Sequence, residues 1–168
     1  MTEPVVAFEP MAKLMSAEQA LAALGTRRPM VFTNGVFDIL HRGHVSYLCT
    51  ARALGACLVL GLNSDASARG LGKGPDRPLN KELDRAFVLG GLACVDAVVL
   101  FGEGTPVALL RRLRPDVYVK GGDYDIEALE ETALVRSWGG RALALPFVEG
   151  YSTTQLVQRI RSAEEKKT

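Results

Sequence analysis

The stretch VFTNGVFDILHRGHVSYL, residues 31–48, joins an apolar segment to an amphipathic one through a polar turn. Its first residues predict a strand, and the residues that follow His41 predict a helix. Both histidines of the chain, His41 and His44, lie at this junction. Because residues three apart on a helix share a face, the two rings should project into the same volume. A strand that leads through a polar turn into a helix is typical of the first unit of a parallel α/β fold.

The alternation of apolar and amphipathic segments continues along the chain. Strands are predicted at residues 30–33, 57–62, 97–101, 116–119 and 141–145. Helices are predicted at residues 16–25, 43–54, 81–92, 105–113, 126–137 and 153–163. Strands such as CLVLGL and DAVVLF are apolar on both faces, which favours a parallel sheet that is covered by helices on both sides. We therefore predict a Rossmann-like three-layer α/β/α sandwich with a parallel sheet of about five strands.

Composition restricts the class of protein. A chain of 168 residues with 48% hydrophobic content suits one compact domain. The net charge of +1 gives no general attraction to nucleic acid or to an anionic membrane, so we expect neither as a partner. The longest apolar run, residues 86–95, is too short to span a bilayer, and the N-terminus lacks a basic, apolar leader. Three cysteines in apolar segments indicate buried thiols in a reducing cytoplasm.

Four polar stretches follow predicted strand ends, which is where ligands bind in parallel sheets. They are TNGVFDILHRGH, NSDASARGLGKGPDRP, KGGDYD and VEGYSTTQ. No G-x-G-x-x-G follows the first strand, and GLGKGP lacks the spacing of a P-loop, so dinucleotide enzymes and P-loop ATPases are disfavoured. A zinc-dependent hydrolase that uses HxxH remains an alternative, although the pattern without a third ligand is weak evidence for a metal.

The first stretch resembles the T/H-x-G-H family of nucleotidylyltransferases, which join a nucleoside triphosphate to a phosphorylated partner and release pyrophosphate. After a strand, the residues that carry the match stand in the family's order: Asn34, Gly35, Phe37, Asp38, His41, Gly43 and His44. From about residue 30 to residue 161 the chain is similar to the sugar-phosphate adenylyltransferases that make ADP-heptose. Further matching segments are NSDAS at 63–67, RPLN at 77–80, VKGGDY at 119–124 and EGYSTT at 149–154.

The resemblance implies that a sugar-phosphate oxygen attacks the α-phosphorus of ATP, with Mg²⁺ as a cofactor. Such a transfer needs positioned donors and cations and no nucleophile from the protein. By resemblance, His44 is the main stabiliser of the transition state, His41 is its partner on the phosphates, and Lys120 reaches a phosphate from a strand end. One preorganised donor is worth roughly 3 to 4 kcal/mol of barrier. As an alternative, the histidine pair caps or packs a helix.

The other candidate residues each have a structural alternative. The resemblance makes Asp38 part of the nucleotide site and a candidate Mg²⁺ ligand, but it could cap the following helix. Lys73 lies among glycines in a loop that suits a lid over an anion, or it is a solvated lysine. Arg85 could be an exposed helical arginine. Ser152 opens a capping box, and the same helix start suits a triphosphate. The full set of expected cofactor-binding residues is Thr33, Asn34, Gly35, Phe37, Asp38, Gly43, Asn63, Asp65, Lys73, Arg77, Arg85, Gly121, Gly122, Asp123, Ser152, Thr153 and Thr154.

From the resemblance we predict transfer of AMP from ATP to D-glycero-D-manno-heptose 1-phosphate, giving ADP-heptose and pyrophosphate for lipopolysaccharide core or a related surface glycan. We expect an N-terminal helical extension at 1–28, a nucleotidylyltransferase domain at 29–163 and a disordered tail at 164–168. Because 168 residues leave no room for a fused sugar kinase, we expect a separate heptose kinase in the same pathway. A homodimer is also expected.

Two other functions stay open at this point. One is a cytidylyltransferase that acts on glycerol 3-phosphate or another polyol phosphate, although the sequence FVEGY before Ser152 favours the adenylyl branch. The other is a non-catalytic nucleotide sensor that kept the pocket and lost turnover. The presence of His41, His44 and Lys120 argues against a sensor.

Overall fold

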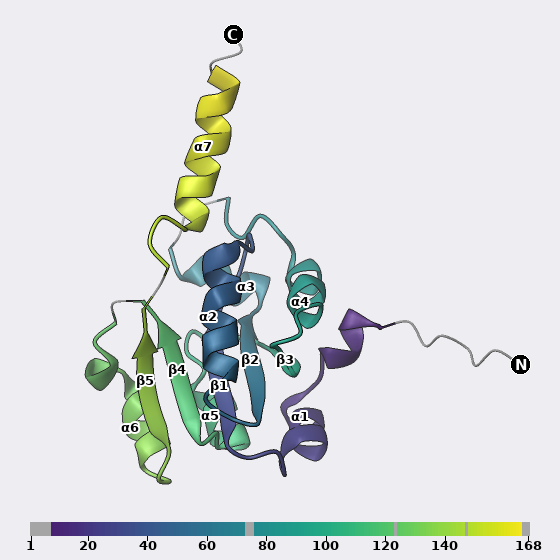
Figure 1. Ribbon diagram of the computed structural model, residues 1–168, viewed down its shortest axis with the longest axis vertical. Coiled ribbons are helices and arrows are strands. Elements are labelled where there is room, and N and C mark those ends of the chain that lie inside the picture. The colour runs from purple at the N-terminus through teal and green to yellow at the C-terminus, as the bar shows by residue number, and fades with distance from the viewer. Residues whose placement is uncertain (1–7, 73–75, 123, 147, 166–168) are drawn as a thin grey trace, which may run out of the picture.

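The computed structural model describes residues 8–72, 76–122, 124–146 and 148–165 (Figure 1). Its centre is a sheet of five parallel strands in the order β3-β2-β1-β4-β5. The strands are β1 (Met30–Gly35), β2 (Cys57–Asn63), β3 (Ala97–Phe101), β4 (Val117–Gly121) and β5 (Arg141–Leu145). All five predicted strands are confirmed, and their ends differ from the prediction by no more than two residues.

The six predicted helices are also present. The helical segments are η1 (Pro10–Lys13), α1 (Ala17–Leu24), α2 (Arg42–Arg52), α3 (Asp65–Gly70), α4 (Glu82–Gly90), α5 (Val107–Leu113), η2 (Ile126–Ala128), α6 (Glu130–Arg136) and α7 (Thr153–Glu165). The single helix predicted over 126–137 is divided into η2 and α6 at Leu129. Neither η1 nor α3 was predicted, because segments this short do not show a helical period of apolar residues.

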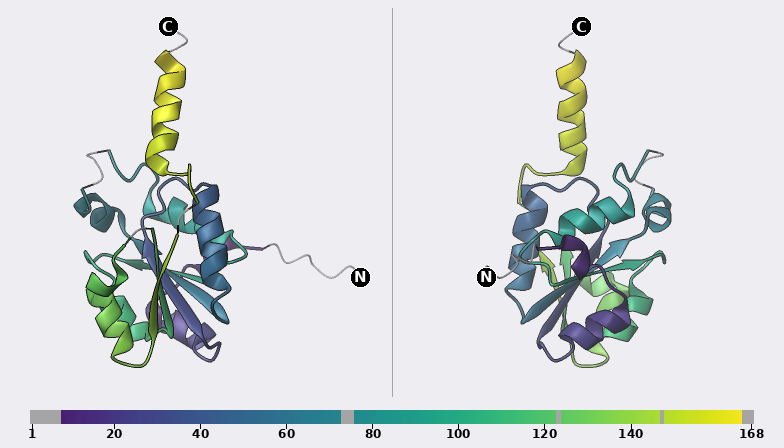
Figure 2. Two further views of the ribbon diagram at one scale, coloured as in Figure 1. Left: turned by 60° about the vertical axis from the view of Figure 1, so that its left-hand side comes forward. Right: turned by 90° about the vertical axis from the view of Figure 1, so that its right-hand side faces the viewer.

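Helices cover both faces of the sheet, as Figures 1 and 2 show, and this confirms the three-layer prediction. Successive residues of β1 point to opposite faces. Phe32 belongs to the core cluster that includes residues of α1, α5 and α6. Val31 belongs to the cluster that includes residues of α2 and α4. The central strands are therefore buried on both sides, as their apolar sequences predicted.

The segment before β1 packs on this sheet. Ser16 caps α1 in a capping box with Gln19, and Leu24 of α1 is part of the core. Leu14 forms a parallel bridge with Val98 at the edge of the sheet. Residues 14–24 thus pack against the two faces of the sheet, and the boundary placed at residue 28 stays a prediction. At the other end α7 runs to Glu165, and residues 166–168 lie outside the described residues.

The cysteine expectation is only partly correct. Cys57 is buried in β2, whereas Cys94 is half-buried and Cys49 is exposed on α2. The Cys49 side chain lies beside that of Cys94. Among the described residues, none of the helices combines the length and apolar character that a bilayer crossing requires.

The topology fixes where a ligand can bind. From β1 the chain goes to β2 and β3 on one side, and later to β4 and β5 on the other. In such sheets the crevice lies at the carboxyl ends of the strands, where the order reverses. Helix α2 begins just after the end of β1, and the first turn of α7 lies at the same end of the molecule (Figures 1 and 2). The Thr153 hydroxyl donates to the Ile39 carbonyl over 3.4 Å, which joins these two regions.

Candidate active site

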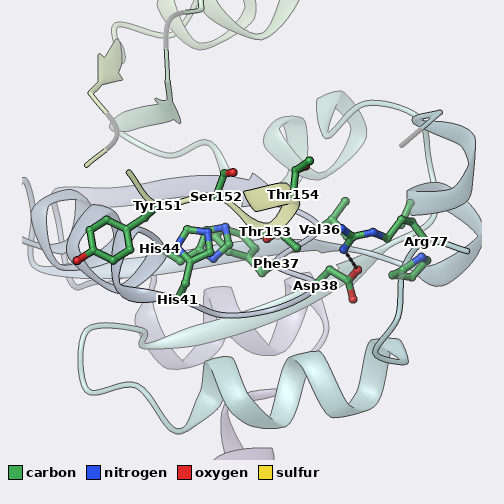
Figure 3. Close-up of a pocket in the computed structure, with 12 residues that line it drawn as sticks. Val36, Phe37, Asp38, His41, His44, Arg77, Tyr151, Ser152, Thr153 and Thr154 are labelled. Atoms are coloured by element: carbon green, nitrogen blue, oxygen red, sulfur yellow. Dashed lines mark hydrogen bonds and ion pairs between the residues drawn. The ribbon is translucent and has the colours of Figure 1, made fainter. Parts of the chain in front are cut away.

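A cavity of about 430 Å³ opens at this end of the sheet (Figure 3). Three of the four polar stretches singled out in the sequence line it, although they are far apart along the chain. Its lining consists of Val36, Phe37, Asp38, His41, His44, Ala68, Arg77, Pro78, Tyr151, Ser152, Thr153 and Thr154. We call it the first cavity.

The two histidines face each other in the first cavity. Their ring centroids are 3.8 Å apart and the ring planes meet at 22°. His41 is the N-cap residue of α2, yet its side chain makes no capping hydrogen bond. Its Nδ1 atom is buried and has no hydrogen-bond partner among the described residues. His44 also contacts the Phe37 ring edge-on, with centroids 5.3 Å apart. The capping alternative therefore does not account for the ring of His41.

Two glycines make room for this arrangement. A Cβ atom on Gly43 would lie 3.0 Å from the His41 ring and 3.1 Å from Cβ of Tyr151. A Cβ atom on Gly35 would lie 2.8 Å from the Phe37 ring. Phe37 itself has a φ of 47°, which non-glycine residues rarely adopt, so its backbone is strained next to the site. Gly43 was expected among the cofactor-binding residues, and in the structure it leaves space for an imidazole and a tyrosine.

The burial of His41 gives a prediction about pH. Burial lowers the pKa of the His41 imidazole below its ordinary value of 6.5, since it disfavours the charged ring. The unfolded chain therefore binds this proton at a higher pH than the folded protein does. The contribution of neutral His41 to the free energy of unfolding is fully present above about pH 6.5. It is lost as the pH falls toward and through the lower pKa of the folded state.

We expect the wild-type protein to lose more free energy of unfolding than His41→Gln between pH 7 and pH 5, because glutamine does not titrate. Urea denaturation of both proteins across this range measures the difference, in which titrating groups that do not contact His41 cancel. Parallel pH profiles would contradict the assignment.

Asp38 organises the loop on one side of the first cavity. Its carboxylate accepts hydrogen bonds from the Leu79 amide at 2.8 Å and the Asn80 amide at 2.9 Å. The Arg77 guanidinium donates to it over 2.7 Å, which Figure 3 marks with a dashed line. Burial alone would raise the pKa of Asp38, but these amides and Arg77 outweigh it, so the pKa is lowered. The carboxylate thus holds residues 77–80 in place.

This geometry does not fit Asp38 as a magnesium ligand. Both carboxylate oxygens already accept hydrogen bonds from the protein. Within the described residues, no three histidine, cysteine or acidic side chains are grouped closely enough to hold a metal ion. We therefore derive no step of the reaction through a metal on this residue.

We expect Asp38→Asn to lower the free energy of unfolding by about 1 to 3 kcal/mol, because it weakens hydrogen bonds to a buried charge. We also expect the Mg²⁺ concentration for half-maximal activity to stay unchanged. Chemical denaturation and a magnesium titration of the initial rate measure the two effects. Asp84→Asn, on the exposed side of α4, is the matched control. A tenfold or larger rise in the Mg²⁺ requirement of Asp38→Asn alone, of roughly 1.4 kcal/mol, would restore Asp38 as a ligand.

The N-terminus of α7 forms the opposite wall. Ser152 caps it, since its hydroxyl accepts from the Gln155 amide at 3.1 Å. In Figure 3 the side chains of Ser152, Thr153 and Thr154 lie along this wall. A helix start presents unpaired amides and a positive dipole end, which attract phosphate groups. The predicted segment therefore does border the cavity.

Tyr151 also lines the first cavity and was missed. Its ring lies 6.5 Å from the His41 ring at an angle of 25°. The Arg42 guanidinium lies over the Tyr151 ring, 5.6 Å from its centre, and donates to the Tyr151 hydroxyl over 3.3 Å. Arg42 was left out of the predicted site as well. Tyr151 lies within the matching segment EGYSTT, but its residue type gave no reason to assign it a role.

A second cavity of about 430 Å³ adjoins the first. Its lining consists of Asn34, Gly35, Val36, Phe37, His44, Tyr47, Asn63, Leu71, Gly104, Pro106, Lys120, Gly121, Tyr124 and Glu131. Val36, Phe37 and His44 line both cavities and form the wall between them. Lys120, at the end of β4, donates to the Asn34 side-chain oxygen over 3.4 Å. The structure thus brings Lys120 and His44 to one cavity, as the sequence predicted.

Several predicted residues lie behind the cavities instead. The Thr33 hydroxyl is buried and pairs with the Tyr47 hydroxyl at 2.6 Å. Gly122 has a φ of 105°, and its amide donates to the Leu145 carbonyl, so it shapes the turn after β4. Lys73 and Asp123 lie outside the described residues.

Arg85 is an internal support and not an exposed residue of α4. Its side chain is fully buried and forms an ion pair of 2.7 Å with Asp65. Its guanidinium also donates to three carbonyls, those of Val36, Asn63 and Asn80. The geometry favours a structural role for Arg85 and Asp65, since Arg85 ties three cavity-forming loops together.

The fold and the donors around the first cavity define a nucleotide-binding α/β enzyme of the nucleotidylyltransferase class. Paired imidazoles and two helix starts at a sheet switch point suit a bound triphosphate. The chain belongs to the cytidylyltransferase-like family, whose family model matches residues 32–159.

The chain is also similar to individual proteins whose names specify a substrate or a pathway. The chain is 59% identical over 152 residues to the D-beta-D-heptose 1-phosphate adenylyltransferase of Bordetella bronchiseptica, covering 89% of this chain and 94% of that protein. It is 54% identical to the bifunctional protein HldE of Syntrophotalea carbinolica, but spans only 28% of that protein's length. Among solved structures, the lipopolysaccharide core biosynthesis protein of Thermoplasma volcanium has a TM-score of 0.60 and 30% identity, covering 73% of this chain and 98% of that one.

Proposed function

We propose that this enzyme transfers AMP from ATP to D-glycero-D-manno-heptose 1-phosphate, giving ADP-heptose and pyrophosphate. The observation that carries the proposal is the 59% identity to a D-beta-D-heptose 1-phosphate adenylyltransferase over nearly the full length of both chains. The product would serve the synthesis of lipopolysaccharide core or a related surface glycan. The resemblance to a lipopolysaccharide core biosynthesis protein supports this use.

The two cavities suit the two substrates. The first has paired imidazoles, Arg77 and the start of α7, which are donors for a triphosphate. The second has Lys120 for the acceptor phosphate, together with amide and hydroxyl groups for a sugar. His44 lines both, so the α-phosphorus would lie beside it.

In this arrangement a phosphate oxygen of the sugar attacks the α-phosphorus of ATP, and the bond from that phosphorus to the pyrophosphate oxygen breaks. His44 donates to the α-phosphoryl oxygens as negative charge builds on them, and His41 holds the neighbouring phosphates. Mg²⁺ is proposed only as the counter-ion that accompanies ATP and neutralises its charge. The protein positions both reactants, which is where most of the acceleration in such transfers arises.

The test is a panel of phosphorylated acceptors with ATP or CTP, followed by pyrophosphate release. We expect release with ATP and heptose 1-phosphate, and formation of ADP-heptose in equal amount. Release with CTP and glycerol 3-phosphate instead would favour the cytidylyltransferase alternative, which agrees with the description of the family as cytidylyltransferase-like. Binding of ATP without release from any acceptor would indicate a nucleotide sensor.

Three further parts of the proposal concern the cellular setting. The enzyme would work in the cytoplasm, where ATP is available. A separate heptose kinase would supply the sugar 1-phosphate. Two copies of the chain would form a homodimer.

A further inference from the structure

Glu131 is a largely buried acidic residue that has no role in the proposed transfer. It lies in the first turn of α6, is only 8% exposed, and lines the second cavity. None of the described residues gives this carboxylate a hydrogen bond or an ion pair. Its oxygens are not among the buried polar atoms that lack a partner, so they are accessible from the second cavity and can accept hydrogen bonds from a ligand there.

The groups around Glu131 suit a phosphorylated polyol. Lys120 supplies a cation in the same cavity. Asn34 and Asn63 add amide groups, and Tyr124 adds a half-exposed ring. Hydroxyl groups of a sugar are donors that need acceptors, and a carboxylate accepts through two oxygens. The cavity therefore has one group for a phosphate and a different group for hydroxyls.

The charge of Glu131 is felt inside the site. Burial, and next the nearby charge of Glu131, raises the pKa of the Tyr118 phenol. The Tyr118 hydroxyl donates to the same Asn34 oxygen that accepts from Lys120. Glu131 is thus close to the polar groups on which the acceptor would rest. An anionic phosphate is repelled from Glu131 and attracted to Lys120, so the two charges give the acceptor one orientation.

We propose that Glu131 is a specificity-determining residue that accepts hydrogen bonds from hydroxyl groups of the sugar-phosphate acceptor. The inference rests on the proposed function, because it assigns the second cavity to the acceptor. It adds a requirement: a bound acceptor covers this carboxylate, so one that lacks the recognised hydroxyls leaves it unsatisfied and is rejected.

A simpler role for Glu131 is to stabilise the start of α6 through the helix dipole. Glu130 shares this role, since it stands in the same first turn, but it is exposed and does not line the cavity. Glu130→Gln is therefore a matched control with the same change of charge on the same helix turn.

The experiment compares wild type, Glu131→Gln, Glu131→Ala and Glu130→Gln by pyrophosphate release with ATP and heptose 1-phosphate. We expect Glu131→Gln to raise KM for the sugar phosphate about tenfold or more, with a larger rise in Glu131→Ala. KM for ATP should change by less than about twofold in each. Thermal melting of the four proteins identifies any variant that has lost its fold. If Glu131→Ala does not fold, the isosteric variant Glu131→Gln still tests the proposal.

A second measurement uses acceptors that lack one hydroxyl at a time. We expect at least one of these acceptors to bind wild type and Glu130→Gln more weakly than the full acceptor does. The same acceptor should lose much less affinity for Glu131→Gln. A purely structural role for Glu131 would not produce this difference. Equal KM values for Glu131→Gln and Glu130→Gln with an active wild type would overturn this inference alone. If none of the sugar phosphates supported pyrophosphate release by the wild-type protein, the proposed function would be overturned as well.

Discussion

Replacing His44 with alanine is expected to lower kcat at least 100-fold, an effect of about 3 kcal/mol on the barrier. His44 stands in the wall between the two cavities, held by the His41 ring on one side and the Phe37 ring on the other. A donor fixed in this way needs no reorganisation when charge develops on the α-phosphoryl oxygens. Alanine leaves that charge without its donor. Steady-state pyrophosphate release at saturating substrates measures the effect.

The fold should survive this substitution, because His44 is only half-buried. Far-UV circular dichroism and thermal melting check this point. Thr50→Ala, at an exposed position further along α2, is the control and should keep wild-type kcat. A fall of only a few fold in His44→Ala would remove His44 from its assigned role.

Replacing Arg85 with alanine is expected to have the largest effect on stability. The change leaves three backbone carbonyls without their donor and Asp65 without its cation. Removing one partner of a buried, hydrogen-bonded ion pair costs about 3 kcal/mol or more. For a chain of this size that corresponds to a fall in Tm of roughly 6 to 12 °C. Calorimetry or a thermal melt followed by circular dichroism measures it.

Two variants sharpen this test. Arg111→Ala on α5 removes an exposed arginine and should leave Tm unchanged. Arg85→Lys keeps the charge but cannot reach three carbonyls, so its Tm should fall between those of wild type and Arg85→Ala. A Tm for Arg85→Ala close to that of Arg111→Ala would show that the network around Arg85 carries little of the stability.

The fold could be predicted because its signals are local. Strands such as β2 are apolar throughout, and α1 carries its own capping residues, Ser16 and Gln19. The positions of His41 and His44 followed from helical spacing and from the family resemblance together. The meeting of the first and last polar stretches followed from the rule that strand ends share one edge of a parallel sheet.

The roles of Asp38 and Arg85 could not be predicted, because their partners are backbone groups far away in sequence. The Leu79 amide is 41 positions from Asp38, and the Val36 carbonyl is 49 positions from Arg85. Any residue type supplies such groups, so the sequence contains no sign of them. Glu131 was missed for a related reason: in the sequence it is one of two adjacent acids, and only burial distinguishes it from Glu130.

The partition between the cavities links the two ligands thermodynamically. Residues 36–44 supply Val36, Phe37 and His44, and these three form a wall of each cavity. A nucleotide that shifts this wall changes the space offered to the sugar, and the sugar acts on the nucleotide in the same way. By linkage, if bound ATP changes the dissociation constant of the acceptor by some factor, the bound acceptor changes the dissociation constant of ATP by the same factor.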